Sequence, residues 1–450
     1  MMEIVLQSVE TTLDPFDIYS IFKGEKDVSV LDSQRDHESL GMYSFIGINP
    51  FLVIKGKNDY CLINGVEYRY DGFDKLSEIL KEYKVENKTD IPFIGGCIGY
   101  LSYDYGLTIE DISHSSLEDL KIPHYYFIFY DNLIIFDNVN KKTYVTSCGM
   151  LMEHSKSIGL LIERIKKQEK IEKYGVTESN AIFTSNFSKE EYIKTIGKMR
   201  EYIRNGDIYI ANLTQRFQSK TFKDAYEIYR DLRTVNPAPF AAVLHLEGFD
   251  IISSSPERFL KIYNNEVETR PIKGTRPRGK NEEEDAKNRE ELINSEKDRA
   301  ELLMIVDLER NDLSKVCKPH SVKVTELFKI EEYSTVFHLV STVKGELMDN
   351  VDSVQCLKSC FPGGSITGTP KIRAMEIIDE LEGIKRGLYT GCIGYFSFDG
   401  NADFNIAIRT IIKKGNDVYF GVGGGITWDS SEEAEYLECL DKAKALMMVI

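Results

Sequence analysis

GCIGYLSYD at residues 96–104 returns almost unchanged as GCIGYFSFD at residues 391–399. The two copies differ only by Leu101 against Phe396 and by Tyr103 against Phe398. Apolar and aromatic residues around a glycine are typical of a buried strand. Two equivalent strands in similar surroundings would explain the repeat. We favour a duplicated architecture in which two related β-sheets face each other.

Strand signals dominate the region around the first copy, and helix signals follow. Residues 43–56 and 125–147 are rich in β-branched and aromatic residues separated by Gly, Asn and Asp. Ser188 and Glu191 form a capping-box signature for a helix, and a long helix is expected over residues 281–310. These patterns predict strands mixed with helices and a loose boundary near residue 185. That boundary would divide an N-terminal region, 1–185, from a catalytic region, 186–450.

The composition excludes several classes of protein. The chain has 450 residues, 42% hydrophobic content and a net charge of −16, which argues against nucleic acid or an anionic membrane as a partner but does not exclude a small anionic substrate. No apolar run reaches the length of a membrane span and no signal-peptide pattern is present, so we expect a cytoplasmic protein.

The eight cysteines are expected to be buried thiols. Residues 95–99 fit the G-x-C-x-G elbow of glutamine amidotransferases, but their strand-like setting favours packing over a Cys97 nucleophile.

Two short segments place charge where packing does not require it. Glu257 follows a proline at the edge of a strand. Lys273 lies in the tight turn PIKGTRPRG at 271–279, where a small residue would fit more easily. By pattern alone Lys273 is a surface lysine in a turn.

Paired carboxylates recur on two predicted helices. Asp298 and Glu301 are three residues apart, and Glu435, Glu438 and Lys442 follow at spacings of three and four. These spacings place each set on one helix face. A single such pair is usually a solvated face, but two pairs beside a lysine suit Mg²⁺ and a substrate carboxylate.

Glycine-rich segments and two isolated polar residues complete the candidate site. The segment 361–378 is a turn followed by a helix whose N-terminus, with Lys371, favours an anion. Three consecutive glycines at 423–425 let backbone approach a ligand closely. Arg409 is placed in an apolar strand, where it is costly unless it meets an anion. His338 is either a core residue or a site residue.

In these segments the chain resembles the chorismate-utilising enzymes, which include the large components of anthranilate synthase and aminodeoxychorismate synthase. The resemblance is dense over 190–450 and weaker before it, and its motifs are PIKGTRPRG, AELLMIVDLERNDL, FHLVSTVKGEL, FPGGSITGTPKIRAMEIIDELE, GYFSFDG, AIRT and GGGITWDSSEEAEYLECLDKAKAL. It implies an α+β fold of two facing antiparallel β-sheets flanked by helices.

The resemblance also implies roles for particular residues. The implied metal is Mg²⁺, bound by Glu301 and Glu438 with Asp298 and Glu435 in support. The implied catalytic residues are Lys273, Glu257 and His338. The residues implied to bind substrate are Gly274, Thr275, Ser365, Thr367, Gly368, Tyr389, Arg409, Gly423, Gly424, Gly425 and Lys442.

Lys273 discriminates between members of the family. Anthranilate synthases normally have Ala in the motif P-I-x-G-T, whereas aminodeoxychorismate synthases have Lys. The resemblance then implies covalent catalysis: the lysine attacks C2 of chorismate, Glu257 protonates the leaving C4 hydroxyl, and ammonia displaces the lysine to give 4-amino-4-deoxychorismate. Attack requires a neutral amine, so the pKa of Lys273 should be depressed.

Two positions depart from the family pattern. Ile210 replaces the glutamine usual in aminodeoxychorismate synthases and the lysine that activates water in isochorismate synthases. The isoleucine side chain has no basic group that could activate a water molecule, which argues against water as the nucleophile. Leu302 replaces the polar residue often found after the metal-binding glutamate.

A partner subunit and a second ligand are also implied. Because the chain shows no credible glutaminase, ammonia should come from a separate glutamine amidotransferase, and a lyase would then release 4-aminobenzoate for folate. Segments that resemble the family's tryptophan pocket are Leu31, Asp32, Ser33, Tyr43, Ser44, Asn236, Pro237, Ala238, Pro239 and Phe240. Tryptophan could regulate, be held structurally or be absent. The competing interpretations are anthranilate synthase component I and a non-catalytic binding protein of the same fold.

Overall fold

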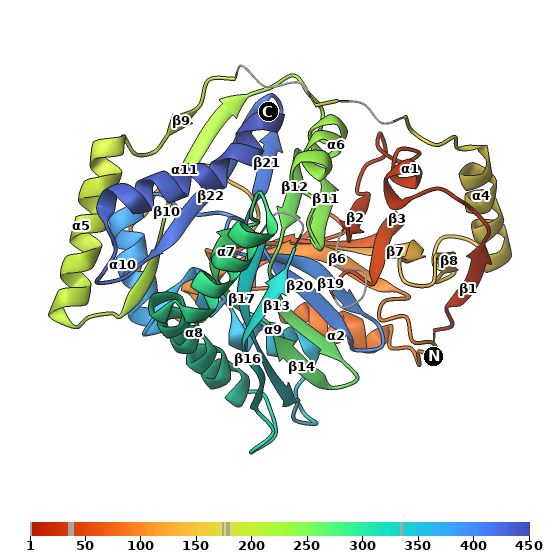
Figure 1. Ribbon diagram of the computed structural model, residues 1–450. Coiled ribbons are helices and arrows are strands. Elements are labelled where there is room, and N and C mark those ends of the chain that lie inside the picture. Colours follow the sequence, from red (N-terminus) through yellow and green to blue (C-terminus); the bar gives the residue numbers. More distant parts are fainter. Residues whose placement is uncertain (1, 35–39, 173–174, 177–180, 334–335) are drawn as a thin grey trace.

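The computed structural model describes residues 2–34, 40–172, 175–176, 181–333 and 336–450 (Figure 1). Its strands form two antiparallel sheets, called the first and second ladder below. The two sheets share two long strands, β3 (Tyr43–Gly56) and β7 (Tyr125–Asp137). The first half of β3 pairs with the second half of β7, and the register shifts between Pro50 and Leu52. Such an irregularity bends a strand, so one pair of strands can serve two sheets.

The first ladder runs in the order β9-β10-β22-β21-β12-β11-β2-β3-β7-β8-β1. Its further strands are β1 (Val5–Val9), β2 (Ser29–Asp32), β8 (Lys142–Ser147), β9 (Thr184–Ser185), β10 (Ile210–Lys220), β11 (Phe240–Leu246), β12 (Phe249–Ser255), β21 (Thr410–Lys414) and β22 (Asp417–Ile426). The short β18 (Gly368–Thr369) pairs with the start of β10.

The second ladder runs in the order β5-β4-β3-β7-β6-β19-β20-β13-β14-β17, and β15 and β16 also pair with β17. Its strands are β4 (Cys61–Ile63), β5 (Val66–Tyr68), β6 (Gly96–Leu101), β13 (Arg258–Tyr263), β14 (Glu266–Thr269), β15 (Ile272–Pro277), β16 (Lys323–Glu332), β17 (Val336–Glu346), β19 (Cys392–Ser397) and β20 (Ala402–Ile406).

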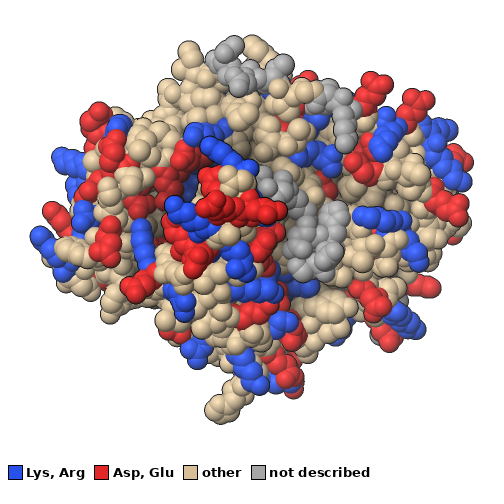
Figure 2. All heavy atoms as spheres, viewed as in Figure 1, with Lys and Arg blue, Asp and Glu red and all other residues tan. Residues whose placement is uncertain are grey.

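Helices cover the outer faces of both ladders. They are α1 (Pro15–Tyr19), α2 (Lys75–Glu82), α3 (Tyr105–Ile109), α4 (His154–Lys167), α5 (Lys189–Asn205), α6 (Ala225–Val235), α7 (Glu282–Asn294), α8 (Glu296–Ser314), α9 (Ser353–Cys360), α10 (Lys371–Glu382) and α11 (Glu432–Val449), with a 3₁₀ turn η1 (Gly364–Ile366). In Figure 1, α5, α10 and α11 lie beside β10 and β22. On the face in Figure 2, acidic and basic side chains gather where Figure 1 places α7 and α8.

Three apolar clusters bind these layers together. One joins the first ladder to helices such as α5, α6 and α11, and another joins the second ladder to α2, α8 and α9. The third lies between the ladders and contains Ile98 and Ile393 from one and Leu244 and Ile412 from the other. Burial of both inner faces confirms the expected pair of facing antiparallel sheets flanked by helices.

The repeated sequences occupy neighbouring strands, which corrects our interpretation of the echo. β6 pairs directly with β19, and Gly99 lies opposite Gly394. The two copies therefore meet within one ladder, and do not mark equivalent strands in two facing sheets. Cys97 is fully buried and burial raises its pKa, so it behaves as a packed thiol.

Two further expectations concern the helices and the chain division. The capping box of Ser188 and Glu191 is present at the start of α5. The helical stretch expected over 281–310 is present but divided into two helices, because Ser295 ends α7 and its hydroxyl accepts the Asp298 N–H to begin α8. β2 and β6 pair with strands beyond residue 185, and the division into 1–185 and 186–450 stays a prediction. No helix in the described part of the chain is long and apolar enough to cross a membrane.

Candidate active site

A cavity of about 600 Å³ collects most of the predicted site residues. Its walls come from β15, the glycines of β22, the start of α8 and the inner face of α11. The predicted residues that line it are Glu257, Lys273, Gly274, Thr275, Asp298, Glu301, His338, Ser365, Tyr389, Arg409, Gly423, Gly424, Gly425, Glu435, Glu438 and Lys442. Segments far apart in the sequence thus converge on one volume.

Lys273 is half-buried in β15 and its amine faces this cavity. Its Nζ donates a hydrogen bond of 3.0 Å to the carbonyl oxygen of Ser365. Burial lowers the pKa of Lys273, and the carboxylates of Glu301 and Glu257 only partly oppose this effect. Gly274, with φ of +77°, turns the chain after the lysine, and a Cβ there would lie 2.9 Å from Asp298 Cγ. The backbone therefore presents a lysine with an enlarged fraction of neutral amine.

Glu257 is buried next to the same lysine. Its Oε1 accepts a hydrogen bond of 3.4 Å from the backbone N–H of Ile272. Burial raises the pKa of Glu257, although the Ser365 hydroxyl and Lys273 act in the opposite direction. A carboxyl group that keeps its proton closer to neutral pH is suited to protonate a leaving group.

Two carboxylates of α11 lie near the glycines of β22. A Cβ added to Gly424 would lie 3.3 Å from Glu435 Oε2, 3.7 Å from Lys442 Nζ and 3.9 Å from Glu438 Oε1. Lys442 Nζ also lies 2.8 Å from Glu438 Oε1, and this pairing helps to lower the pKa of Glu438. Glu301 and Glu435 instead have raised pKa values, caused first by burial.

The residues present fit a metal ion held by few protein ligands. Glu301 Oε1 is buried and has no hydrogen-bond partner within the described ranges. Asp298 is engaged by Arg276 at 3.0 Å, and Glu435 accepts a hydrogen bond of 2.7 Å from the Ser430 hydroxyl. Among the described residues no group of three or more His, Cys, Asp or Glu side chains is arranged to hold a metal. Mg²⁺ commonly takes one or two carboxylates and completes its shell with water and substrate.

Arg409 and Tyr389 provide cationic and phenolic groups on another wall. Arg409 lies in the bend between β20 and β21 with φ of +52°, and not within a strand as expected. Its Nη1 donates to the Lys442 carbonyl at 2.6 Å, and no described carboxylate forms an ion pair with it. Tyr389 is buried, and burial raises its pKa, so the phenol keeps its proton. Both side chains are equipped to donate hydrogen bonds to a carboxylate.

His338 is a neutral member of the site. Its Nδ1 lies 2.9 Å from Thr275 Oγ1. Burial and the nearby Arg409 lower the pKa of His338 to about 4. At neutral pH the ring can therefore donate or accept a hydrogen bond but carries no charge.

Three residues from the glycine-rich segment are not brought to the cavity. Thr367 Oγ1 donates to the Gly363 carbonyl at 2.9 Å, and Gly368 pairs with Ala211 in the β10–β18 ladder. Lys371 is buried in an ion pair with Asp312 and also donates to two backbone carbonyls. The expected contribution of Lys371 to an anion site is therefore wrong, because its ammonium group holds the fold together.

Other cavity residues were missed by sequence reasoning. Asn212, Lys297 and Arg276 line the cavity, and Lys297 Nζ lies 3.9 Å from carboxylate oxygens of both Glu301 and Glu435. The spacing of four between Lys297 and Glu301 was a readable signal for that lysine. Asn212 lies in a strand, and its sequence context gives no sign that it faces a cavity.

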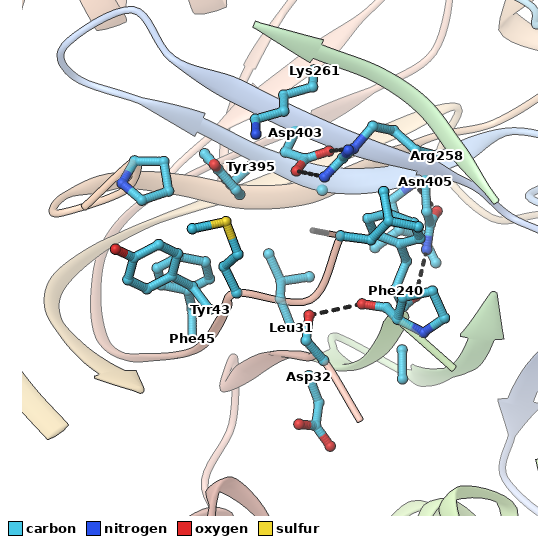
Figure 3. A pocket seen from close by; sticks show the side chains of 18 of the residues that line it. Leu31, Asp32, Tyr43, Phe45, Phe240, Arg258, Lys261, Tyr395, Asp403 and Asn405 are labelled. Atoms are coloured by element: carbon cyan, nitrogen blue, oxygen red, sulfur yellow. Dashed lines mark hydrogen bonds and ion pairs between the residues drawn. The ribbon is translucent and has the colours of Figure 1, made fainter. Parts of the chain in front are cut away.

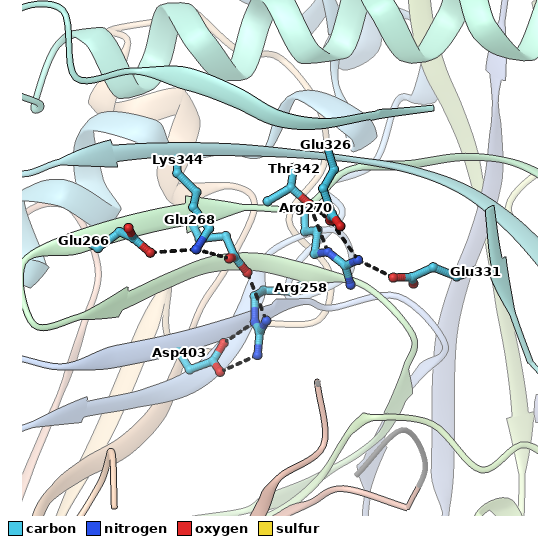
Figure 4. Close-up of polar contacts among 9 residues, drawn as sticks. All are labelled: Arg258, Glu266, Glu268, Arg270, Glu326, Glu331, Thr342, Lys344 and Asp403. Carbon is cyan, nitrogen blue, oxygen red and sulfur yellow. Dashed lines mark hydrogen bonds and ion pairs between the residues drawn. The ribbon is translucent and has the colours of Figure 1, made fainter. Parts of the chain in front are cut away.

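An ion-pair network braces the strands behind the site (Figure 4). Arg258 forms hydrogen bonds of 3.0 Å with both carboxylate oxygens of Asp403 and lies 3.3 Å from Glu268. Arg270 contacts Thr342, Glu326 and Glu331. Arg258 thus ties β13 to β20 and β14, and Arg270, the residue after β14, contacts β16 and β17, so the strands around β15 are linked to one another.

A second cavity, of about 440 Å³, contains part of the predicted tryptophan pocket (Figure 3). Leu31, Asp32, Ser33, Tyr43, Pro239 and Phe240 line it. Figure 3 shows the Asp32 carboxylate directed away from the labelled aromatic side chains, and it accepts a hydrogen bond of 2.6 Å from Tyr229.

The remaining residues of the predicted pocket lie elsewhere. Ser44 does not line the second cavity, and it donates a hydrogen bond to Asp32 at 3.3 Å. Asn236, Pro237 and Ala238 line the first cavity. Tryptophan binding stays a prediction.

Comparison with known proteins gives one consistent family. The profile of a family described as chorismate binding enzyme matches residues 27–448. Aminodeoxychorismate synthase component 1 of Bacillus subtilis is 39% identical, over 91% of this chain and 89% of that protein. Anthranilate synthase component 1 of Acetivibrio thermocellus is 38% identical, over 97% of this chain and 92% of that protein.

Solved structures agree with this result. Anthranilate synthase component I from Streptococcus pneumoniae superposes with a TM-score of 0.83 at 32% identity, covering 98% of this chain and 99% of the other. The isochorismate synthase MenF from Escherichia coli has a TM-score of 0.76 at 15% identity, covers 100% of this chain and 94% of its own, and shares the fold. Overall identity to the two kinds of component 1 is nearly equal, so individual residues must separate them.

Proposed function

Because the chain belongs to the chorismate-binding enzyme family, we propose that it is an aminodeoxychorismate synthase component I. It would convert chorismate and ammonia to 4-amino-4-deoxychorismate, a precursor of 4-aminobenzoate and folate. The observation that carries this proposal is the half-buried amine of Lys273, which faces the cavity with a lowered pKa. A residue that only closed a turn would have no reason to be desolvated there.

Chorismate carries two carboxylates, and the cavity offers two places for them. Arg409 and Tyr389 would hold the enolpyruvyl carboxylate on one wall. Glu301 and Glu438 would hold Mg²⁺ near Lys442, and the bound cation would supply positive charge for the ring carboxylate. Anchoring both ends of the substrate would hold its ring against the wall that carries Lys273 and Glu257.

The chemistry proceeds as two displacements. The neutral Nζ of Lys273 forms a bond to C2, the ring double bonds shift, and the C4–O bond breaks as Glu257 gives its proton to the leaving hydroxyl, releasing water. Ammonia then forms a bond to C4, the double bonds shift back, the C2–Nζ bond breaks to release Lys273 as a neutral amine, and a proton from the new C4 ammonium group returns to Glu257. The sum is chorismate plus ammonia giving aminodeoxychorismate plus water. Division into two steps allows the original C4 geometry to be kept.

Ammonia would come from a separate glutamine amidotransferase. The names of the component 1 relatives indicate that those proteins have a second component. Cys97 in this chain is fully buried, which does not suit a glutaminase nucleophile. Ile210 is also buried; a Cβ on Gly425 would lie 3.2 Å from its Cδ1 and 3.7 Å from Lys273 Nζ. An apolar side chain at this place favours ammonia over a water molecule that needs a base.

The second candidate is anthranilate synthase component I. Its support is the 38% identity to the Acetivibrio thermocellus protein, which is nearly the same as the identity to the aminodeoxychorismate synthases. That activity would release pyruvate and give anthranilate without a lysine adduct. The two candidates therefore differ in whether Lys273 ever becomes covalently modified.

The experiment is to detect that modification. The protein is incubated with chorismate and Mg²⁺ without ammonia, quenched in acid, digested and analysed by mass spectrometry. We expect the peptide containing Lys273 to carry chorismate minus one water molecule, and ammonium to remove this adduct. Lys297, which lines the same cavity, is the internal control and should stay unmodified. An unmodified Lys273 peptide, in a preparation that converts chorismate once ammonium is added, would contradict the proposal.

A further inference from the structure

The turn that contacts Lys273 is itself fixed from two sides. Ser365, whose carbonyl accepts the Lys273 hydrogen bond, is the middle residue of η1. The backbone groups of its two neighbours are each held by a buried charged side chain. These are Glu309 from α8, which contacts Gly364, and Arg386, which contacts Ile366.

Glu309 holds the first neighbour. Its Oε1 accepts a hydrogen bond of 2.9 Å from the N–H of Gly364, and its Oε2 lies 3.3 Å from Thr269 Oγ1. Glu309 is only 3% exposed and does not line the cavity. A buried carboxyl group without a role in substrate binding is costly, so its contact with the turn calls for an explanation.

Arg386 holds the second neighbour. Its Nη1 donates to the Ile366 carbonyl at 3.0 Å, and its guanidinium is fixed by a buried ion pair with Glu382. Arg386 Nη1 also contacts Thr390 Oγ1 at 3.2 Å, next to Tyr389. Both ends of the turn are therefore fixed, and the Ser365 carbonyl between the two anchors accepts the Lys273 hydrogen bond.

The direction of that carbonyl matters for a neutral amine. An amine that donates one N–H to a fixed carbonyl has its lone pair confined to the remaining tetrahedral directions, and Lys273 lines the cavity. We propose that Glu309 is a positioning residue for Lys273: through Gly364 it fixes the Ser365 carbonyl and thereby orients the attacking nitrogen. The inference deepens the proposed function, because it names what aligns the proposed nucleophile.

Two variants of Glu309 test the inference. Glu309→Gln keeps an oxygen that accepts the Gly364 N–H, whereas Glu309→Ala removes it. In the ammonia-dependent reaction we expect Glu309→Ala to lower kcat about 100-fold with little change in KM for chorismate, because alignment is lost while the carboxylate anchors remain. Glu309→Gln should keep most of the activity. Equal losses in the two variants, or an unchanged kcat in Glu309→Ala, would overturn the inference.

A matched control separates positioning from general loss of structure. Asp379 on α10 is also a buried carboxylate that accepts a backbone N–H, that of Ser115 at 2.8 Å, but it does not contact η1. Hydrogen exchange should become faster in peptides covering 361–368 in Glu309→Ala, and should stay as in the wild type in Glu309→Gln and Asp379→Ala. Unchanged exchange in Glu309→Ala would also overturn the inference, and this readout does not depend on activity.

A double-mutant cycle distinguishes failure of this inference from failure of the proposed function. If Glu309 acts through Lys273, Glu309→Ala should cost little further activity in a Lys273→Ala background. If Lys273→Ala alone is fully active, the proposed function fails. If Lys273→Ala is inactive but Glu309→Ala behaves as the wild type, only the positioning role fails.

Discussion

Glu257 Oε1 accepts the backbone N–H of Ile272 at 3.4 Å, so the buried carboxyl group is tied to the residue that precedes Lys273. The proton donor and the nucleophile of the proposed reaction are thus linked through one peptide unit. Their separation therefore depends on the start of β15, and the Ser365 turn contacts both groups from the other side of the site.

The first prediction concerns Glu257. Replacement by Gln removes the proton donor but keeps the shape and an acceptor for the Ile272 N–H. We expect kcat to fall by about 10²–10⁴-fold, the usual contribution of a positioned general acid, with KM for chorismate nearly unchanged. Steady-state kinetics with ammonium as co-substrate measure this. A loss confined to KM would assign Glu257 to substrate binding.

The second prediction follows from the lowered pKa of Lys273. Because only the neutral amine attacks, kcat/KM should rise with pH and level off below the ordinary lysine pKa of 10.5. The free energy of unfolding should also increase with pH. Because the pKa of Lys273 is lower in the folded state than in the unfolded state, the unfolded chain binds more protons, so stability rises as pH increases through this range.

Lys273→Met provides the check on stability. It removes the cost of desolvating an ammonium group, and should therefore stabilise the protein more at neutral pH than above pH 10.5. Urea unfolding at several pH values measures the difference. A stabilisation that is independent of pH would contradict the lowered pKa.

The third prediction concerns His338, whose pKa is lowered to about 4. In the unfolded chain the ring takes up a proton near its ordinary pKa of 6.5, so the folded state loses stability as pH falls from 6.5 towards 4. His338→Gln should reduce this loss. Thermal unfolding at pH 7.5 and pH 5 for both proteins tests it, and identical shifts would show that other groups are responsible.

The fourth prediction concerns Mg²⁺. Glu301→Gln and Glu438→Gln should each raise the Mg²⁺ concentration needed for half-maximal activity by at least about 10-fold, because each removes a charged oxygen ligand. Glu433→Gln on the same α11 is the matched control, since Glu433 instead contacts Lys189 at the surface. Equal Mg²⁺ requirements in all three variants would place the metal elsewhere.

The fifth prediction tests the ladder formed by the repeated sequences. A Cβ on Gly394 would lie 2.0 Å from the Asp403 carbonyl oxygen, which leaves no room between β19 and β20. Gly394→Ala should therefore destabilise the protein by about 3 kcal/mol or more, as overpacking of a rigid site does. Gly159→Ala, in α4 with open space around it, is the control and should not destabilise. Urea unfolding of both variants decides the matter.

Local patterns made part of this structure predictable. Ser188 and Glu191 define the start of α5 because a capping box depends on residues only three apart. The carboxylates of α8 and α11 were likewise placed on single helix faces by their spacing. Such signals depend only on residues that are close together in the chain, so they can be recognised from the sequence.

Contacts between distant segments were not predictable in the same way. Lys371 forms an ion pair with Asp312, and the sequence around Lys371 does not indicate that partner. The repeat showed that two segments are strands but gave no sign that β6 and β19 would pair with each other. Arg409 was placed in a strand because its apolar neighbours carry no signal for the bend with positive φ.

Product identification tests the central claim most directly. The protein and its Lys273→Ala variant are incubated with chorismate, Mg²⁺ and a high concentration of ammonium, and half of each reaction receives excess aminodeoxychorismate lyase. We predict that the wild type gives 4-aminobenzoate only where lyase is present, and that Lys273→Ala gives almost none. Anthranilate in both halves of the wild-type reaction, at a rate unaffected by Lys273→Ala, would contradict the account.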